Sequence, residues 1–199
     1  MFPLGSVLFP HALLPLHVFE DRYRVLVERC LADDTPFGVV LIERGSEVGG
    51  GDVRFPVGTL ARIVQAGRFD DGRYALVATG VQRYRIREWL ADDPFPRARV
   101  DVLAESSDPD GAVLIPEVTL LLRRVIALHA QLGAAVPSET IELAVDPVRA
   151  SFEAAALAPI GPLDAQRLLE LDDAGERLAR LVDLLADEAS VLEFRLSGS

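Results

Sequence analysis

The side chains that could perform acid, base, nucleophilic or metal chemistry in this chain are few and poorly grouped. The histidines are His11, His17 and His129, and the two that are close in sequence stand six residues apart across a proline. That is not a metal-ligand spacing. Ser6, His17 and Asp21 have the residue types of a nucleophile, its base and an orienting acid, but no G-x-S-x-G turn accompanies them. We therefore expect no metal, no cofactor and no catalytic residue.

The remaining reactive groups are acidic pairs and one cysteine. The adjacent acidic pairs stand where we expect turns or helix ends, so solvated carboxylates explain them: Asp33-Asp34, Asp70-Asp71, Asp92-Asp93 and Asp172-Asp173. Cys30, the only cysteine, lies on the apolar side of a predicted helix. We expect it to be buried and unreactive, with no internal disulfide.

Lysine is absent, because all 20 basic residues of the Lys+Arg class are arginines. A phosphate-binding Walker loop places a lysine ammonium on the β- and γ-phosphates. A serine–lysine dyad needs an amine that can lose its proton, and arginine, with a pKa above about 12, does not readily do so. The sequence therefore predicts neither an ATPase of this type nor a Ser–Lys peptidase.

Composition and charge indicate a globular protein of two parts. Half of the residues (50%) are apolar and 26% are charged. Residues 1–104 carry 13 Arg against 14 Asp and Glu, whereas residues 105–199 carry 7 against 17, so most of the net charge of −11 lies in the second part. The Ser-, Pro-, Asp- and Gly-rich residues 105–111 read as a linker between a domain at 1–104 and one at 112–199.

Hydropathy gives no sign of a membrane span or a leader peptide. The longest apolar stretch, residues 113–122, is interrupted by Pro116 and Glu117, short of the about 18 uncharged residues that a membrane helix needs. Apolar strand residues begin at Phe2, where a cationic leader would stand. We therefore expect a cytoplasmic protein without membrane contact.

The first part has the pattern of short strands with one helix. Two proline-bracketed apolar runs, residues 2–10 and 13–19, predict short strands, because proline is confined to strand ends, edges and bulges. From Phe19 the apolar period changes to that of a helix, whose buried side we expect to hold the following residues: Phe19, Tyr23, Leu26, Val27, Cys30 and Leu31. Gly49-Gly50-Gly51 marks a loop tip.

Alternation then predicts a hairpin. Asp71-Gly72 is a turn signal between a strand that ends near Arg68 and one that begins at Arg73. Buried and exposed positions should alternate along the second strand, with Tyr74, Leu76, Ala78, Tyr84 and Ile86 on buried faces and Arg83, Arg85 and Arg87 pointing outward. Short strands at close spacing with an early helix predict a small, partly open β-barrel.

The second part has helical start and stop signals. Pro116 suits the first turn of a long helix, Pro137-Ser138 begins a short one, and Asp146-Pro147 reads as a cap followed by a first-turn proline. Asp173 and Glu176 fit a capping box for a last helix with an apolar stripe of Leu178, Leu181, Leu185 and Leu192. The predicted fold class is α+β, a barrel followed by an α-helical bundle.

Three ordered blocks carry a family resemblance. Residues 2–24 (FPLGSVLFPHALLPLHVFEDRYR) and 55–86 (FPVGTLARIVQAGRFDDGRYALVATGVQRYRI) resemble the amino-terminal, substrate-binding domain of the ATP-dependent Lon protease family. Residues 146–181 resemble its helical half, in which a D-P helix start precedes L-L-E-x-x-[DN]-x-x-x-R-L. The resemblance implies a barrel similar to the RNA-binding pseudouridine-synthase-and-archaeosine-transglycosylase (PUA-like) fold. Since 199 residues leave no room for ATPase and peptidase domains, we expect a stand-alone copy.

The preferred functional prediction is a non-catalytic module that recognises unfolded or tagged polypeptides. Such a module needs exposed apolar side chains with charged groups at their rim. We assign Leu13 and Leu14, on a proline-rich loop between the first strands, and Asp21 and Arg22, at the exposed start of the helix. An adaptor, a competitor for substrates and a regulator with a protease or other protein partner all fit, and weak self-association is left open.

Two other classes of function are weighed against this one. Arg83, Arg85, Arg87, Arg97 and Arg99 could line one sheet surface and bind RNA, as the barrel type suggests. The near-neutral first part, the acidic second part and the lack of an aromatic run argue against nucleic acid. An uncharacterised hydrolase is the third class, and it has no supporting motif.

Overall fold

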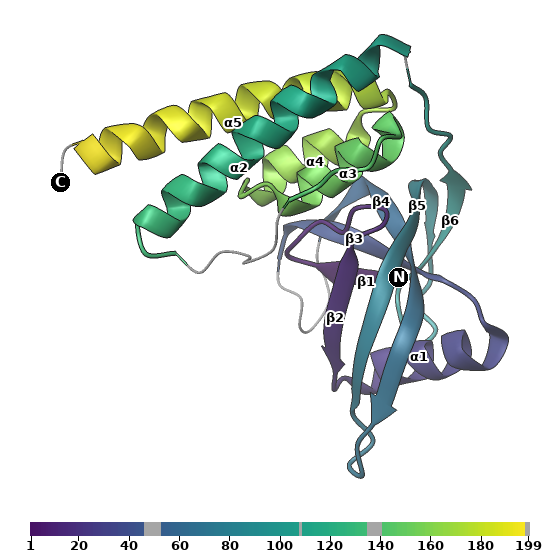
Figure 1. Cartoon of the computed structure of the whole chain (residues 1–199). Coiled ribbons are helices and arrows are strands. Elements are labelled where there is room, and N and C mark those ends of the chain that lie inside the picture. Colours follow the sequence, from purple (N-terminus) through teal and green to yellow (C-terminus); the bar gives the residue numbers. More distant parts are fainter. Residues whose placement is uncertain (46–52, 108, 135–140, 198–199) are drawn as a thin grey trace. The chain divides into compact units, whose positions relative to one another are not determined.

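The computed structural model describes residues 1–45, 53–107, 109–134 and 141–197. They form two compact units, Met1–Ala104 and Glu105–Ser199, which are treated separately below (Figure 1). The expected loop tip at Gly49-Gly50-Gly51 and the helix start at Pro137-Ser138 lie outside the described residues.

In its described residues, the first unit consists of one bent sheet of six strands and one helix. Its elements are β1 (Phe2–Leu4), β2 (Leu13–Val18), α1 (Asp21–Asp33), β3 (Phe37–Arg44), β4 (Val53–Arg68), β5 (Tyr74–Leu90) and β6 (Arg97–Val102). The strand order is β1-β3-β4-β5-β2, and β6 pairs with a second stretch of β5. Only β1 and β3 are parallel. Because β1 and β2 end the order without pairing to each other, the predicted partly open barrel is confirmed.

The hairpin between β4 and β5 forms where the sequence predicts it. Gly72 has a positive φ of 83°, a conformation that costs glycine little. Its N–H donates to the carbonyl of Phe69 at 2.9 Å, and the N–H of Phe69 donates to the carbonyl of Arg73 at 2.9 Å. This turn sets the register of the two longest strands.

One expectation along β5 is wrong: Arg83 is buried instead of lying on the exposed face with Arg85 and Arg87. Leu60 pairs with Gln82 but Ala61 pairs with Gly80, so Val81 is an extra residue in β5. A bulge of one residue exchanges the two faces of a strand. Beyond it, Arg83 therefore shares the face of Ala61.

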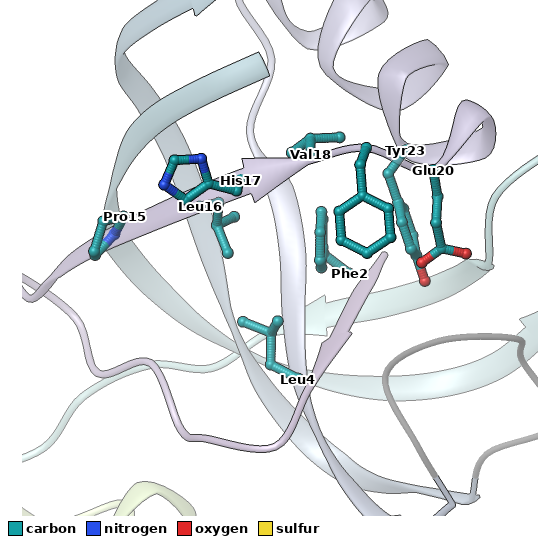
Figure 2. A pocket seen from close by; sticks show the side chains of 9 residues that line it. Phe2, Leu4, Pro15, Leu16, His17, Val18, Glu20 and Tyr23 are labelled. Carbon is teal, nitrogen blue, oxygen red and sulfur yellow. The ribbon is translucent and has the colours of Figure 1, made fainter. Parts of the chain in front are cut away.

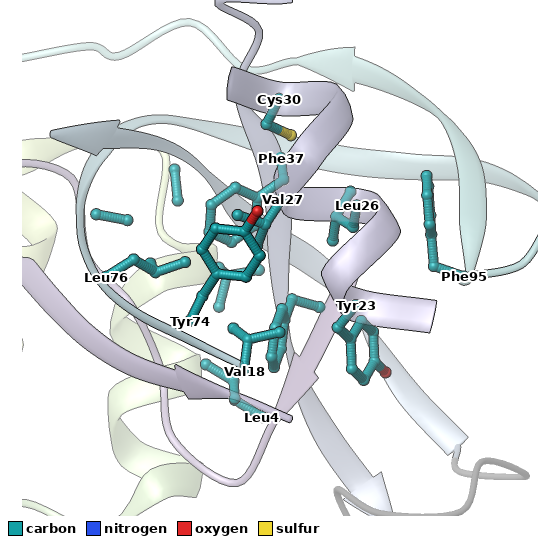
Figure 3. Packing of buried hydrophobic residues seen from close by; sticks show 14 of the residues in the cluster. Leu4, Val18, Tyr23, Leu26, Val27, Cys30, Phe37, Tyr74, Leu76 and Phe95 are labelled. Atoms are coloured by element: carbon teal, nitrogen blue, oxygen red, sulfur yellow. The ribbon is translucent and has the colours of Figure 1, made fainter. Parts of the chain in front are cut away.

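The core of the first unit lies between the sheet and α1. Tyr23, Leu26, Val27 and Cys30 of α1 pack against buried strand residues (Figure 3). Phe2 stacks on Tyr23 with ring centroids 4.2 Å apart. The prediction that Cys30 is buried is confirmed.

Two expected members of the buried helix side are instead exposed. Phe19 precedes the helix, which begins at Asp21, and its side chain is 55% exposed. Leu31 is in the helix but lies on its solvent side. The helical period therefore starts later than the apolar pattern suggests.

The second unit is helical: η1 (Pro109–Leu114), α2 (Ile115–Gln131), α3 (Pro147–Leu157), α4 (Pro162–Glu170) and α5 (Ala174–Ser197). In Figure 1, α2 and α5 lie side by side and run in the same direction. Arg124 of α2 and Glu193 of α5 form an ion pair between them. The predicted stripe of Leu178, Leu181, Leu185 and Leu192 is fully buried. None of the helices in the described part of the chain has the length and hydropathy of a membrane span.

The predicted helix caps form as expected. The Asp146 carboxylate accepts from the N–H of Arg149 at 2.8 Å, and the Asp173 carboxylate accepts from the N–H of Glu176 at 3.1 Å. The segment interpreted as a linker contributes to this unit, because the N–H of Ser106 donates to the carbonyl of Asp172 at 3.1 Å. Ser106 is therefore anchored beside the start of α5.

Arg177 of the second unit is fully buried, with an exposed fraction of 0%. Its guanidinium donates to the carbonyl oxygens of Leu168 (3.2 Å) and Leu171 (2.6 Å) and to the Ser151 hydroxyl (2.7 Å). It forms an ion pair with Glu105 at 3.2 Å and lies 3.9 Å from the centre of the Phe152 ring. One side chain thus joins α3, the end of α4, α5 and residue 105.

Candidate functional site

Three small pockets adjoin the edge strand β2, and all three include His17 in their lining. We call them the edge pocket, the face pocket and the turn pocket.

The edge pocket lies between β1 and β2, which do not pair with each other, and measures about 190 Å³. Figure 2 shows Phe2 and Leu4 of β1 facing β2 across it, with Tyr23 of α1 beside them. Phe2 and Tyr23 stack on one another, so the floor of this pocket is built from core aromatics. The lining is therefore mostly apolar, with Glu20 at its rim.

The other two pockets continue along β2. The face pocket, about 210 Å³, is lined by Pro15, Leu16 and His17 together with Gln65 of β4 and residues 75–77 of β5. The turn pocket, about 220 Å³, is lined by Phe19, Phe69 and Arg73, among others. Phe19 and Phe69 are 55% and 49% exposed, so both present aromatic surface to solvent.

The size of these pockets decides what they can hold. Sites for cofactors and other small molecules typically measure about 300–1,000 Å³. Each pocket beside β2 is smaller and suits a single side chain. No three His, Cys, Asp or Glu side chains of the described residues lie close enough to share a metal ion.

Charged groups at the rim are paired with one another. Arg22 forms an ion pair with Glu20 at 3.0 Å, and Arg73 forms one with Asp71 at 2.7 Å. Hydrogen bonds from Arg73, first from its backbone N–H, hold the pKa of the Asp71 carboxyl below its usual value. The rim therefore carries balanced charge around an apolar floor.

The four residues assigned from sequence adjoin this surface but line none of the three pockets. Leu13 is 67% exposed and opens β2, whereas Leu14 is partly buried against the core. Both belong to a strand, so their placement on a loop is wrong. Asp21 is exposed and pairs with Arg24, while Arg22 is mostly buried, with 19% of its side chain exposed.

Sequence reasoning missed the residues between these two pairs. The pockets are lined by Pro15, His17 and Phe19 from this stretch, and by Phe69 in the turn directly after β4. The available signal was Pro15, because a proline inside a strand indicates an edge. Nothing local in the sequence brings Phe69 to Phe19.

Three of the five arginines considered for RNA binding form ion pairs with carboxylates. Arg99 pairs with Glu88 at 2.8 Å, and Arg87 pairs with Asp101. Arg97 lies 3.3 Å from Asp93. These ion pairs offset part of the positive charge on which phosphate binding depends.

Comparison with known proteins gives a consistent match over almost the whole chain. Residues 1–187 match the sequence family described as the ATP-dependent protease La (LON) substrate-binding domain. Lon protease 2 of Myxococcus xanthus is 30% identical over 194 residues, which is 95% of this chain and 23% of the relative. The chain therefore spans about a quarter of the length of the curated relatives that it matches.

Solved structures match at the level of the whole chain. The crystal structure of a Lon N-terminal domain protein from Xanthomonas campestris has a TM-score of 0.65 and 27% identity, covering 92% of this chain and 95% of that one. The N-terminal domain of a Mycobacterium avium complex Lon protease has a TM-score of 0.62 and 21% identity, covering 93% and 97%. The second likeness supports the fold alone.

Proposed function

The chain belongs to the family of Lon substrate-binding domains, and on that premise we propose that it recognises polypeptides at the β2 pockets without cutting them. The observation that carries this proposal is the row of three side-chain-sized apolar pockets along one exposed strand. Several small apolar pockets suit clients that share apolar residues but no fixed sequence.

The geometry supports capture more than catalysis. The absence of lysine excludes a Ser–Lys pair, and the pockets are lined mostly by carbon-rich side chains, with His17, Glu20 and Arg73 as the exceptions that carry or can gain a charge near neutral pH. His17 lies on β2 without a serine or cysteine in the linings of these pockets. A nucleophile and a base within reach of one another are the first requirement of covalent catalysis.

A binding measurement tests the proposal. A fluorescent, permanently unfolded polypeptide should bind the purified chain weakly, and Phe19→Ser should weaken that binding several-fold because it removes aromatic surface from two pockets. Phe194→Ser is the matched control, since Phe194 is 79% exposed on α5 in the other unit. No binding, or an equal loss in both variants, would contradict the proposal.

A second assay separates two roles that the chain could have in protein quality control. We propose that the chain acts as an adaptor or regulator, and adding it to a Lon-type protease with an unfolded substrate distinguishes the two effects. Faster substrate degradation indicates delivery, and slower degradation that Phe19→Ser relieves indicates competition for the client. Peptide-bond cleavage by the purified chain alone would contradict the non-catalytic role.

We also propose that nucleic acid is not the ligand and that the chain resides in the cytoplasm. The carboxylate partners of Arg87 and Arg99 support the first statement, and the single buried cysteine, typical of reducing compartments, supports the second. Retention of a generic oligonucleotide at low ionic strength would contradict the first statement.

A further inference from the structure

We propose that the client binds as an extended strand added to the free edge of β2, which rests on the proposed function and specifies its binding mode. Within the described part of the chain, β2 pairs with β5 alone. Its other edge faces the edge pocket, whose lining includes residues 15–19. An unpaired edge with a pocket beside it is the arrangement that strand addition requires.

The hydrogen-bonding phase of β2 identifies the main-chain groups that face outward. The N–H of Gly80 donates to the carbonyl of Ala12 at 2.9 Å, which places residue 12 in the phase that bonds toward β5. Since this phase recurs at every second residue of an antiparallel pair, Leu14 and Leu16 also bond toward β5. The N–H and C=O groups of Leu13 and His17 therefore point to the free edge.

Pro15 stands in the outward phase, between Leu13 and His17. Proline has no N–H, and because this position faces outward, the missing N–H interrupts no bond to β5. It removes one donor from the free edge. The edge thus offers a client three carbonyl acceptors but only two N–H donors. This is a partly protected edge, which can pair with another strand but does so weakly.

An extended polypeptide fits this edge better than the other classes of partner. Its own donors and acceptors repeat at the spacing of β2, about 3.3 Å per residue, whereas a helix uses these groups internally. Side chains of an added strand point alternately to the two faces of the sheet. One set of client side chains then faces Phe2 and Leu4 in the edge pocket. The other set lies on the face where Pro15 and His17 line the face pocket.

N-methylation of a peptide tests the binding mode directly. The probe is a short fluorescent peptide of alternating leucine and threonine, methylated at one backbone nitrogen at a time. Strand addition predicts that affinity falls about tenfold or more at every second position and hardly changes at the positions between, because only alternate N–H groups face β2. Equal sensitivity at all positions, or none, would overturn the proposal.

A substitution on the protein makes an independent prediction. Pro15→Val restores an N–H to the free edge and keeps an apolar side chain, so the unmethylated peptide should bind about two- to tenfold more tightly. The gain should vanish for peptides methylated at a facing position. Unchanged or weaker binding of the unmethylated peptide would overturn strand addition, because a site that uses side chains alone gains nothing from a new N–H.

The two proposals fail in different ways. Suppose that the peptide binds and Phe19→Ser weakens its binding, but N-methylation lowers affinity without a two-residue period. Polypeptide recognition then stands and strand addition is overturned. If Pro15→Val only makes the chain dimerise, as sedimentation would show, the edge belongs to a second copy and strand addition of a client is overturned. If no peptide binds at all, both proposals fail.

Discussion

Replacing Arg177 with methionine should destabilise the protein by about 3–5 kcal/mol, the cost of breaking a buried ion pair from one side. The structure accounts for this magnitude. The substitution removes the donor to the Leu168 and Leu171 carbonyls and to the Ser151 hydroxyl, three bonds of 2.6 to 3.2 Å. Each lost bond to a charged donor costs about 1.5–3 kcal/mol, and the apolar methionine side chain offsets part of the sum.

Urea denaturation followed by far-ultraviolet circular dichroism measures this change. Arg124→Met is the matched control, because Arg124 also pairs with a glutamate but its side chain is 56% exposed. Exposed pairs contribute about 0–1 kcal/mol, so the control should stay close to wild type. If Arg177→Met fails to fold, Ser151→Ala removes one of the three bonds and should cost about 1.5–3 kcal/mol. Losses below about 1 kcal/mol for both Arg177→Met and Ser151→Ala would refute the reasoning.

Three further predictions concern the first unit. Gly58→Ala should lower the free energy of unfolding by about 3 kcal/mol in urea titrations, because the new Cβ would lie 2.2 Å from the Val39 carbonyl oxygen; a neutral effect would contradict this packing. Burial raises the pKa of the Cys30 thiol, so a thiol reagent should label it about tenfold or more slowly in buffer than in urea, and equal rates would show that it is accessible. Hydrogen bonds from Arg73 lower the pKa of Asp71, so the carboxylate stabilises the folded state above the usual aspartate pKa, and this contribution is lost as the pH falls through the lowered pKa of the folded state. Asp71→Asn should lose less stability than wild type over that range, and parallel losses would contradict the assignment.

Features that depend on neighbouring residues could be predicted from the sequence. The turn at Asp71-Gly72 and the caps at Asp146 and Asp173 form where the sequence places them. Each needs only a few adjacent residues with the right backbone preference or side-chain acceptor. The leucine stripe of α5 is predictable for the same reason, since its period is a property of one helix.

Features that depend on distant residues could not be predicted. The bulge at Val81 is visible only in the pairing of β5 with β4, and it reverses the expected exposure of Arg83. Arg177 occupies a marked position in the family pattern, but its partner Glu105 lies 72 residues away. Burial of a charge depends on such partners, and charge patterning along one helix does not reveal them.

The candidate site shows the same division within a few residues. The sequence directs attention to residues 13–22, and the structure places the pockets between the two assigned pairs, at residues 15–20. Phe2 and Leu4 of β1, and Phe69 in the turn after β4, complete the linings from parts of the chain outside this segment. The segment could be found by its proline and apolar content, whereas the pockets depend on how three strands come together.

Pro15 explains how an open edge can favour a client over a second copy of the chain. If two β2 edges paired, each strand would bring one proline and the pair would lack two donors. A client without proline at the facing position brings its full set of N–H donors, so its complex with β2 lacks only one donor. The difference of one main-chain hydrogen bond is worth about 0.5–1.5 kcal/mol in favour of the client. A strand with valine at this position would lose that discrimination, and stronger self-association would accompany its tighter peptide binding.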